Sequence, residues 1–138
     1  IPLFQNKKIL ITNSDVFWHE KNFFDVKKII KNFDMSEKCK LLLVKKNNSY
    51  GLMKNDGDLK IKNKILYRWK YKDPIIFYTG LQLINSSIFE NIIDKKFSIN
   101  RVWDSLIENE CLLGQLMTSD WYHVGDSEGI KIANNLYT

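Results

Sequence analysis

Several residue types that often carry function are scarce in this chain of 138 residues. It contains two cysteines, two histidines and only two arginines, Arg68 and Arg101. Cys39 and Cys111 do not form a C-x-x-C pair, which disfavours a disulfide framework or a zinc site. Both thiols are therefore predicted to be buried and reduced, as is typical of a cytoplasmic protein.

The sequence also lacks long apolar runs and the common ligand-binding signatures. No stretch approaches the roughly 18 apolar residues of a membrane span, and no signal-peptide core follows the N-terminus. Walker A, G-x-G-x-x-G and H-E-x-x-H motifs are all missing. We expect no membrane partner. Because the chain begins at Ile1 and soon enters an apolar strand pattern, we expect it to be part of a longer protein.

The charge balance is positive, with 21 basic and 16 acidic residues and a formal net charge of +5. Such a balance raises nucleic acid or an anionic small molecule as a partner. The lysines, however, are scattered among asparagines and isoleucines instead of being clustered. A solvated lysine surface is the preferred interpretation, and no nucleic-acid partner is predicted.

The apolar pattern predicts one α/β domain spanning residues 1–138. Lys8–Thr12 and Lys40–Val44 are continuous apolar runs, typical of strands buried on both faces. Between them, apolar residues at helical spacing predict a helix from Asn22 to Asn32. A strand, a helix and a strand in this order form a βαβ unit.

The middle of the chain predicts antiparallel strands. Asp56-Gly57 is a hairpin turn signal, and Gly80 within an apolar run indicates that another group comes close to the strand. Expected strands are Ser49–Met53, Leu59–Ile61, Ile65–Trp69, Ile75–Ile84 and Cys111–Met117. Expected helices are a short one capped by Asn85-Ser86-Ser87 with Ile88, Phe89, Ile92 and Ile93 as its apolar positions, then Asn100–Ile107, and Glu128–Leu136 capped by Asp126 or Ser127.

Asp15 is the best single candidate for chemistry. It follows a strand directly, where open α/β sheets place their ligand groups, and a lone carboxylate there suits Mg²⁺. A turn-forming or helix-capping aspartate is the alternative. His123, between Trp121-Tyr122 and Val124-Gly125, is either a second ligand or a partly buried histidine. Asp126 is either a helix cap or a ligand.

Two further interpretations stay open on the residues alone. His19 lies near Asp15 and allows an acid–base pair, but no nucleophile sits in an elbow such as G-x-S-x-G. The aromatic residues Phe17, Trp18, Phe23 and Phe24 are expected to be core, with base stacking as the alternative.

Four segments in order resemble those of the sugar-1-phosphate nucleotidylyltransferases. They correspond to the family patterns V-V-N-[GS]-D, F-T-G-I-Q-I, F-S-L-N-x-x-W and W-x-[DH]-V-G-T. In this chain they are Ile9–Asp15, Ile76–Ile84, Phe97–Trp103 and Trp121–Asp126. The resemblance is greatest to short bacterial enzymes of the N-acetylmuramate-1-phosphate uridylyltransferase and mannose-1-phosphate guanylyltransferase type, which serve nucleotide-sugar biosynthesis for the cell envelope.

The resemblance implies a Rossmann-like mixed sheet flanked by helices. It also implies the reaction of an NTP (UTP or GTP) with a sugar 1-phosphate, which gives a nucleotide sugar and pyrophosphate with Mg²⁺ as cofactor. Asp15 matches the first metal-binding, catalytic aspartate, and His123 falls where many members have the second. The implied substrate contacts are Asn13, Gly51, Thr79 and Gly80.

Three departures from the family pattern leave alternatives open. The Gly-rich NTP-binding loop is absent, so the chain is expected to be the C-terminal portion of a catalytic domain and inactive alone. Histidine at 123 is a poor ligand for Mg²⁺, and Asp126 replaces a threonine and is a possible substitute ligand. The alternatives are a noncatalytic nucleotide-sugar-binding remnant or regulatory subunit, and a metal-dependent glycosyltransferase. The sequence leaves the oligomeric state open.

Overall fold

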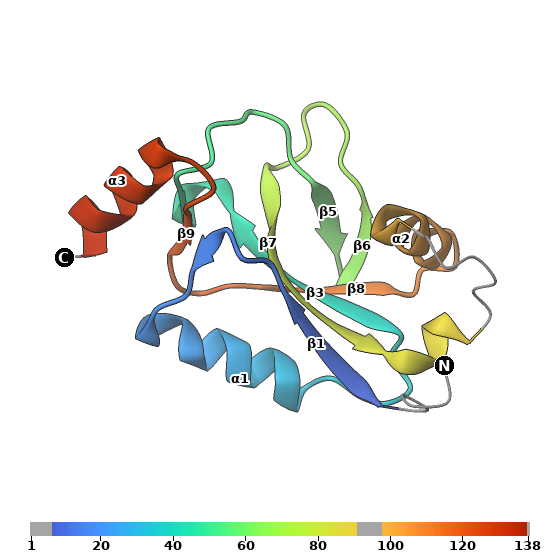
Figure 1. Ribbon diagram of the computed structural model, residues 1–138. Coiled ribbons are helices and arrows are strands. Elements are labelled where there is room, and N and C mark those ends of the chain that lie inside the picture. Colours follow the sequence, from blue (N-terminus) through green and yellow to red (C-terminus); the bar gives the residue numbers. More distant parts are fainter. Residues whose placement is uncertain (1–6, 91–97, 138) are drawn as a thin grey trace.

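The computed structural model of the chain describes residues 7–90 and 98–137 (Figure 1). A six-stranded mixed sheet in the order β1-β7-β3-β8-β6-β5 forms the centre, and a three-stranded sheet in the order β2-β9-β4 lies beside it. Helices flank the main sheet. The predicted α/β class with a mixed, helix-flanked sheet is therefore confirmed.

The strands are β1 (Lys8–Thr12), β2 (Val16–Phe17), β3 (Cys39–Lys45), β4 (Ser49–Tyr50), β5 (Leu59–Lys62), β6 (Ile65–Arg68), β7 (Ile76–Asn85), β8 (Leu112–Leu116) and β9 (Trp121–His123). The α-helices are α1 (Phe23–Lys31), α2 (Ile99–Glu108) and α3 (Ser127–Tyr137). Short 3₁₀ turns are η2 (Glu20–Asn22), η3 (Lys46–Asn48) and η4 (Ser86–Phe89). Ile92, Ile93 and Phe97, which carried parts of the sequence predictions, lie outside the described residues.

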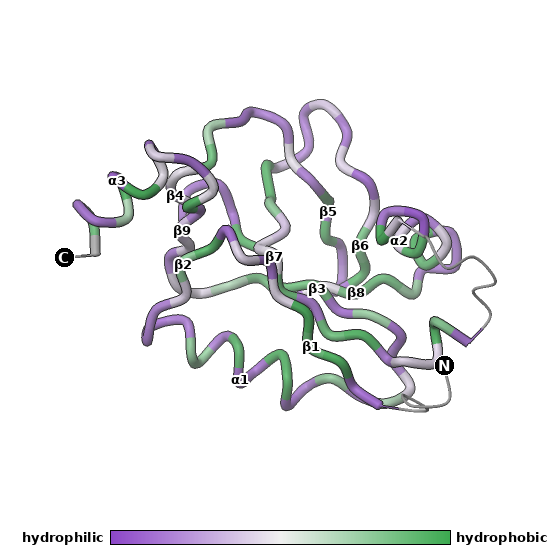
Figure 2. Tube along the Cα trace, in the orientation of Figure 1, coloured by the Kyte–Doolittle hydropathy of each residue, from purple (hydrophilic) through white to green (hydrophobic). Residues whose placement is uncertain are grey.

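The core consists of two apolar layers, one on each face of the main sheet. Along β3, Leu42 and Val44 pack with Ile29 of α1, whereas Leu41 and Leu43 pack with Trp103 of α2. Alternation of side chains along a strand explains this division. Figure 2 shows that apolar residues concentrate along the central strands while the connections are largely polar. The prediction that β3 is buried on both faces is confirmed.

The prediction that β1 is buried on both faces was wrong. β1 is the edge of the main sheet among the described residues, and every second residue along it is exposed, Leu10 by 45%. Within the predicted βαβ unit, β7 lies between β1 and β3 and is antiparallel to both. β1 and β3 therefore run in the same direction and are connected through α1, and the long strand β7 is inserted between them in the sheet.

The predicted hairpin turn was also misplaced. β5 and β6 are joined at Asn63-Lys64, since Lys62 pairs with Ile65, while Asp56-Gly57 precedes β5. A side chain at position 57 would collide with the indole ring of Trp69, because a Cβ there would lie 2.4 Å from Cδ1 of the ring. The expected strand Ser49–Met53 is reduced to the two residues of β4, which is parallel to β9 instead of antiparallel to a neighbour.

The predictions for α1, α2 and α3 agree with the structure apart from small shifts at the ends, whereas the short helix predicted after Asn85 is the 3₁₀ turn η4 within the described residues. Ser98 caps α2 by accepting from the amide of Asn100, and Asn85 caps η4. The prediction that the aromatic residues are core is confirmed for Trp18, which is partly buried and packs against the core. It is wrong for the other three, since Phe17 is exposed and Phe23 and Phe24 are 63% and 65% exposed on α1. Cys39 is buried and Cys111 half-buried, and both are free thiols. No helix within residues 7–90 and 98–137 has the length and apolar character to cross a bilayer.

The small sheet collects the segments that leave the main sheet at one end. The strands β1, β3 and β8 run in the same direction, and the chain passes from them to β2, β4 and β9 respectively. These three short strands then pair with one another. The segments that follow the carboxyl ends of three parallel strands therefore meet in the small sheet. Open α/β sheets form their ligand sites at this end of the strands.

Candidate functional site

Asp15 and His123 meet at this junction. Val16 pairs with His123 in the antiparallel contact between β2 and β9, and the amide of Val124 donates to the carbonyl oxygen of Asp15 over 2.8 Å. The side chains also make contact, with Nε2 of His123 3.2 Å from Oδ2 of Asp15. The structure thus brings together two side chains that are 108 residues apart.

The two members of this pair differ in exposure. The carboxylate of Asp15 is 45% exposed, whereas the imidazole of His123 is 19% exposed. Nδ1 of His123 is buried and has no hydrogen-bond partner within the described residues. Burying an unpaired lone pair at Nδ1 costs less free energy than burying an unpaired N–H at the same atom. In a neutral ring we therefore place the proton on Nε2, where it is donated to Asp15. Asp15 keeps acceptor capacity that faces solvent.

Glycines surround His123, and sequence reasoning missed two of them. A Cβ at Gly125 would lie 2.6 Å from Cε1 of His123 and 3.5 Å from Oδ2 of Asp15. At Gly51, where φ is +91°, and at Gly129, a Cβ would lie 2.2 and 2.3 Å from the carbonyl oxygen of His123. Side chains at these positions would displace His123. The position of Gly125 beside His123 was the available signal.

Asn13 and Gly80 lie together at the end of β1. The amide of Asn13 donates to the carbonyl oxygen of Gly80 over 2.9 Å, and a Cβ on Gly80 would lie 2.9 Å from Cβ of Asn13. The predicted close approach at Gly80 is therefore present, and Gly80 has a positive φ of 93°. Asn13 itself is exposed.

Thr79 is placed differently from its exposed neighbour Asn13. It is fully buried, and its hydroxyl donates to the carbonyl oxygen of Leu42 over 2.8 Å. Its carbonyl oxygen accepts from the indole N–H of Trp121 over 3.1 Å. Thr79 thus connects β3, β7 and β9 within the core. Its hydroxyl is directed at β3 and not at solvent.

Asp126 caps α3. Its Oδ1 accepts from the amide of Gly129 over 2.7 Å, which satisfies one of the free N–H groups at the start of that helix. Within residues 7–90 and 98–137, no three acidic, histidine or cysteine side chains are grouped to hold a metal ion. Asp126 therefore does not join Asp15 and His123 in a three-ligand set.

Of the two side chains that meet at the junction, only the carboxylate of Asp15 has the ligand chemistry that suits a magnesium ion. Mg²⁺ commonly takes one or two carboxylates and completes its shell with water and substrate phosphates. The half-exposed carboxylate of Asp15 meets that requirement. The imidazole of His123 is a softer ligand than a carboxylate and suits Mg²⁺ less well, and its Nε2 already contacts Asp15. Of the two side chains, the carboxylate of Asp15 is therefore the one whose donor chemistry fits Mg²⁺, and His123 is its hydrogen-bonding neighbour.

Asp25 holds the segment that leads to His123, and it was not among the candidates selected from the sequence. The side chain is fully buried. It accepts from both the amide and the hydroxyl of Thr118 over 2.9 Å each, and from the amide and hydroxyl of Ser119 over 3.2 and 2.6 Å. These bonds fix the connection between β8 and β9 that leads to His123. The available signal was a lone acid on the buried stripe of α1, four residues before Ile29.

His19 takes part in the same support and not in an acid–base pair with Asp15. The ring is buried, and Nε2 lies 3.1 Å from the carbonyl oxygen of Asp120. Asn22 also donates to that oxygen, over 3.0 Å, and to the hydroxyl of Ser119, over 2.8 Å. His123, not His19, contacts the carboxylate of Asp15.

Comparison with known proteins places this arrangement in a class of folds. No protein-family model and no curated protein matches the sequence, whereas solved structures do. The chain has a fold of the sugar-phosphate nucleotidyltransferase type, with a mixed sheet flanked by helices.

Two solved structures illustrate the likeness. A Bacillus anthracis protein assigned as a glucose-1-phosphate thymidylyltransferase, crystallised with sucrose, matches with a TM-score of 0.67 and 17% identity over 98% of this chain and 56% of its own. An inositol-1-phosphate CTP transferase from T. maritima matches with a TM-score of 0.62 and 11% identity over 93% of this chain and 53% of its own. The chain spans just over half the length of these neighbours.

Proposed function

We propose that this chain is the sugar-phosphate and metal-binding part of a nucleotidyltransferase that joins an NTP, UTP or GTP, to a sugar 1-phosphate. The observation that carries the proposal is the contact between Asp15 and His123 at the carboxyl ends of parallel strands. The shared fold with two nucleotidyltransferases supports it. The products would be a nucleotide sugar and pyrophosphate.

In this reaction an oxygen of the sugar phosphate attacks the α-phosphorus of the NTP as pyrophosphate leaves on the opposite side. The protein has mainly to align two polyanions, and no protein nucleophile is required. Asp15 would hold Mg²⁺, which when bound neutralises phosphate charge. His123 orients Asp15, and Gly125 leaves space beside both. Asn13 and the backbone at Gly80 are proposed to line the sugar side.

The NTP-binding loop is proposed to come from polypeptide that packs along the edge of the main sheet. β1 is an edge strand among the described residues, and Leu10, Phe23 and Phe24 are exposed near it or on α1. An unpaired strand edge and exposed apolar side chains are each typical of a surface that other polypeptide covers. The chain alone is therefore expected to bind ligand without turnover.

A first experiment measures pyrophosphate release by the 138-residue chain with UTP or GTP, Mg²⁺ and a panel of sugar 1-phosphates. No release is expected from the chain alone, and release is expected from the full-length gene product. Turnover by the chain alone would contradict the proposed division of labour.

A second experiment measures binding of UDP- and GDP-sugars in the presence of Mg²⁺ by calorimetry. Asp15→Asn should abolish the magnesium-dependent part of binding, while Asp56→Asn, at an exposed carboxylate between β4 and β5, should not. Binding that is unchanged by Asp15→Asn would place the ligand elsewhere.

A noncatalytic remnant that binds a nucleotide sugar is the second candidate. The absence of a three-ligand metal group within the described residues favours it over a metal-dependent glycosyltransferase, which needs a pair of carboxylates where Asn13-Ser14-Asp15 offers one. Nucleotide-sugar binding that persists without Mg²⁺, combined with an inactive full-length product, would support this candidate.

A further inference from the structure

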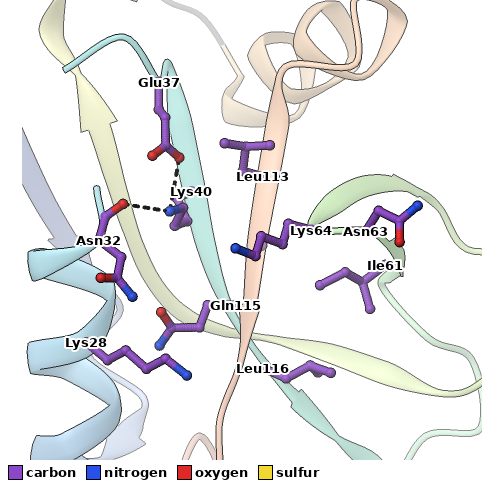
Figure 3. A pocket seen from close by; sticks show the side chains of 11 residues that line it. Lys28, Asn32, Glu37, Lys40, Ile61, Asn63, Lys64, Leu113, Gln115 and Leu116 are labelled. Atoms are coloured by element: carbon purple, nitrogen blue, oxygen red, sulfur yellow. Dashed lines mark hydrogen bonds and ion pairs between the residues drawn. The ribbon is translucent and has the colours of Figure 1, made fainter. Parts of the chain in front are cut away.

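A groove of about 630 Å³ lies over β3 and β8, between α1 and the β5–β6 hairpin (Figure 3). Neither Asp15 nor His123 lines it. The sheet order places β3, β8 and β6 beyond β7 as seen from β1. Polypeptide added along the β1 edge would therefore leave this groove open. It is a separate site and does not depend on the transferase proposal.

The charged residues of the groove do not balance. Three lysines and one glutamate line it, Lys28, Lys40, Lys64 and Glu37. Lys40 is paired with Glu37 over 3.0 Å and also donates to the carbonyl oxygen of Asn32 over 3.1 Å. Lys28 and Lys64 have no carboxylate partner within the described residues. Lys28 and Lys64 are both exposed, so their ammonium groups are available to an anion that enters the groove from solvent.

The neutral groups in the groove are also suited to an anion. Figure 3 shows the amines of Lys28 and Lys64 and the amide of Gln115 directed into the same space. Gln115 donates one amide hydrogen to the carbonyl oxygen of Asp25 over 3.1 Å, which fixes its orientation and leaves the second hydrogen free. Apolar walls are provided by Ile61, Leu113 and Leu116.

The backbone at Lys64 is unusual for a lysine. Asn63 and Lys64 have φ values of 51° and 68°, as both central residues of a two-residue hairpin turn of this hand require. Glycine is the favoured second residue, and a residue with a Cβ costs about 1 kcal/mol more there. The amide of Gly114 donates to the carbonyl oxygen of Lys64 over 2.9 Å, so the strained residue is held against β8. Strain of this kind clusters at functional sites.

We propose that this groove binds a compact polyanion with two linked phosphate groups, such as a diphosphate. The ammonium group of lysine is a common phosphate partner, and a diphosphate supplies anionic oxygens to both walls where a single phosphate serves one. Lys28 and Lys64 hold the two ends, and Gln115 donates between them. The apolar walls accommodate an organic substituent on the phosphate.

The test is a titration of the whole chain with inorganic pyrophosphate in the presence of EDTA, followed by calorimetry and by amide chemical shifts. A Lys28→Ala/Lys64→Gly double variant removes both free amines, and glycine at 64 relieves the turn, so Tm should stay the same or rise. The matched control is Lys27→Ala/Lys62→Ala, which removes the same charge from exposed neighbours on the same helix and hairpin. We expect about a tenfold loss of affinity in the first variant and less than about threefold in the control.

The expected shift changes are centred on Gln115 and Lys64. Equal losses of affinity in both double variants would overturn the proposal, since they would indicate attraction by net charge alone. Changes centred on His123 with Gln115 unmoved would overturn it as well. Asp15→Asn should leave this metal-free binding unchanged, which separates the result from the fate of the transferase proposal.

Discussion

Asp25 and Asp15 each join an early segment to one far along the chain, in opposite surroundings. Asp25 is fully buried and accepts four hydrogen bonds from residues 93 and 94 positions later. Asp15 is 45% exposed and contacts His123, 108 positions later, once. The buried carboxylate has its acceptor capacity fully used and holds the fold. The exposed one retains capacity for a ligand.

The largest expected effect comes from removing the buried carboxylate. Asp25→Ala leaves the amides and hydroxyls of Thr118 and Ser119 without their acceptor and should lower the free energy of unfolding by about 3–5 kcal/mol. Urea denaturation measures this loss. Asp56→Ala, at an exposed carboxylate, is the control and should have little effect. A change below about 1 kcal/mol for Asp25→Ala would remove the distinction between the two aspartates.

The second effect concerns the backbone that carries His123. Gly51→Ala forces a residue with a Cβ to adopt a φ of +91° and places that Cβ 2.2 Å from the carbonyl oxygen of His123. We expect a loss of about 2–3 kcal/mol together with a moved His123 imidazole signal in NMR. Asn47→Ala, at an exposed residue of the preceding turn η3, should do neither. An unchanged imidazole signal in a destabilised Gly51→Ala variant would show that the junction tolerates displacement.

The buried thiol of Cys39 is a third ionisable group to compare with the two aspartates, and it has no charged partner in the part of the chain that the structure describes. Burial raises the pKa of Cys39 from 9.0 to about 12. The folded state therefore binds this proton more tightly than the unfolded state, so the associated stability is complete below pH 9 and declines between pH 9 and 12. From pH 8 to pH 10 the loss should be about 1 kcal/mol.

Cys39→Ala provides the control for this pH dependence. Denaturant titrations at the two pH values should show a smaller decline in the variant than in the parent chain. Burial also raises the pKa of Tyr78, and that contribution remains in both proteins. An identical decline in the two proteins would show that Cys39 does not contribute.

The smallest effect on stability is expected at Asp15. Asp15→Asn should change the free energy of unfolding by no more than about 0.5 kcal/mol, because an exposed pair contributes little. Chemical denaturation alongside Asp25→Ala measures the contrast directly. A loss of stability comparable to that of Asp25→Ala would mean that the fold of the junction depends on Asp15. Asp15 would then be a structural residue and not one available to a ligand.

The sequence predicted most elements because their signals are local. The run Leu41–Val44 has no polar interruption, and α2 has a well-defined apolar face, so β3 and α2 were recognised correctly. Local patterns do not determine strand order, however. The apolar run of β1 is the same whether it lies in the centre or at an edge, and only the insertion of β7 beside it decides this. The turn at Asn63-Lys64 was missed because lysine is an uncommon choice there, while Asp56-Gly57 has the usual composition.

The site was predictable to the extent that its residues follow strands. Asp15 and His123 were selected at strand ends, and the structure places them in contact. Asp25 was missed because its partners, Thr118 and Ser119, are polar residues in a connection with no motif of their own. The exposure of Phe23 and Phe24 was missed because an aromatic pair at the start of a helix has the same spacing whether it is covered or not.

The short strands β2, β4 and β9 each follow one of three parallel strands of the main sheet. This arrangement determines where the chain tolerates changes in length. Inserting one residue into β1 or β8 would turn the side chains that follow it in the strand to the other face and displace Asp15 or His123 from the other. The tip of the β5–β6 hairpin lies on the far side of the sheet and feeds none of these strands. A change of length at that tip is therefore expected to alter the Lys64 groove and leave the Asp15 junction in place.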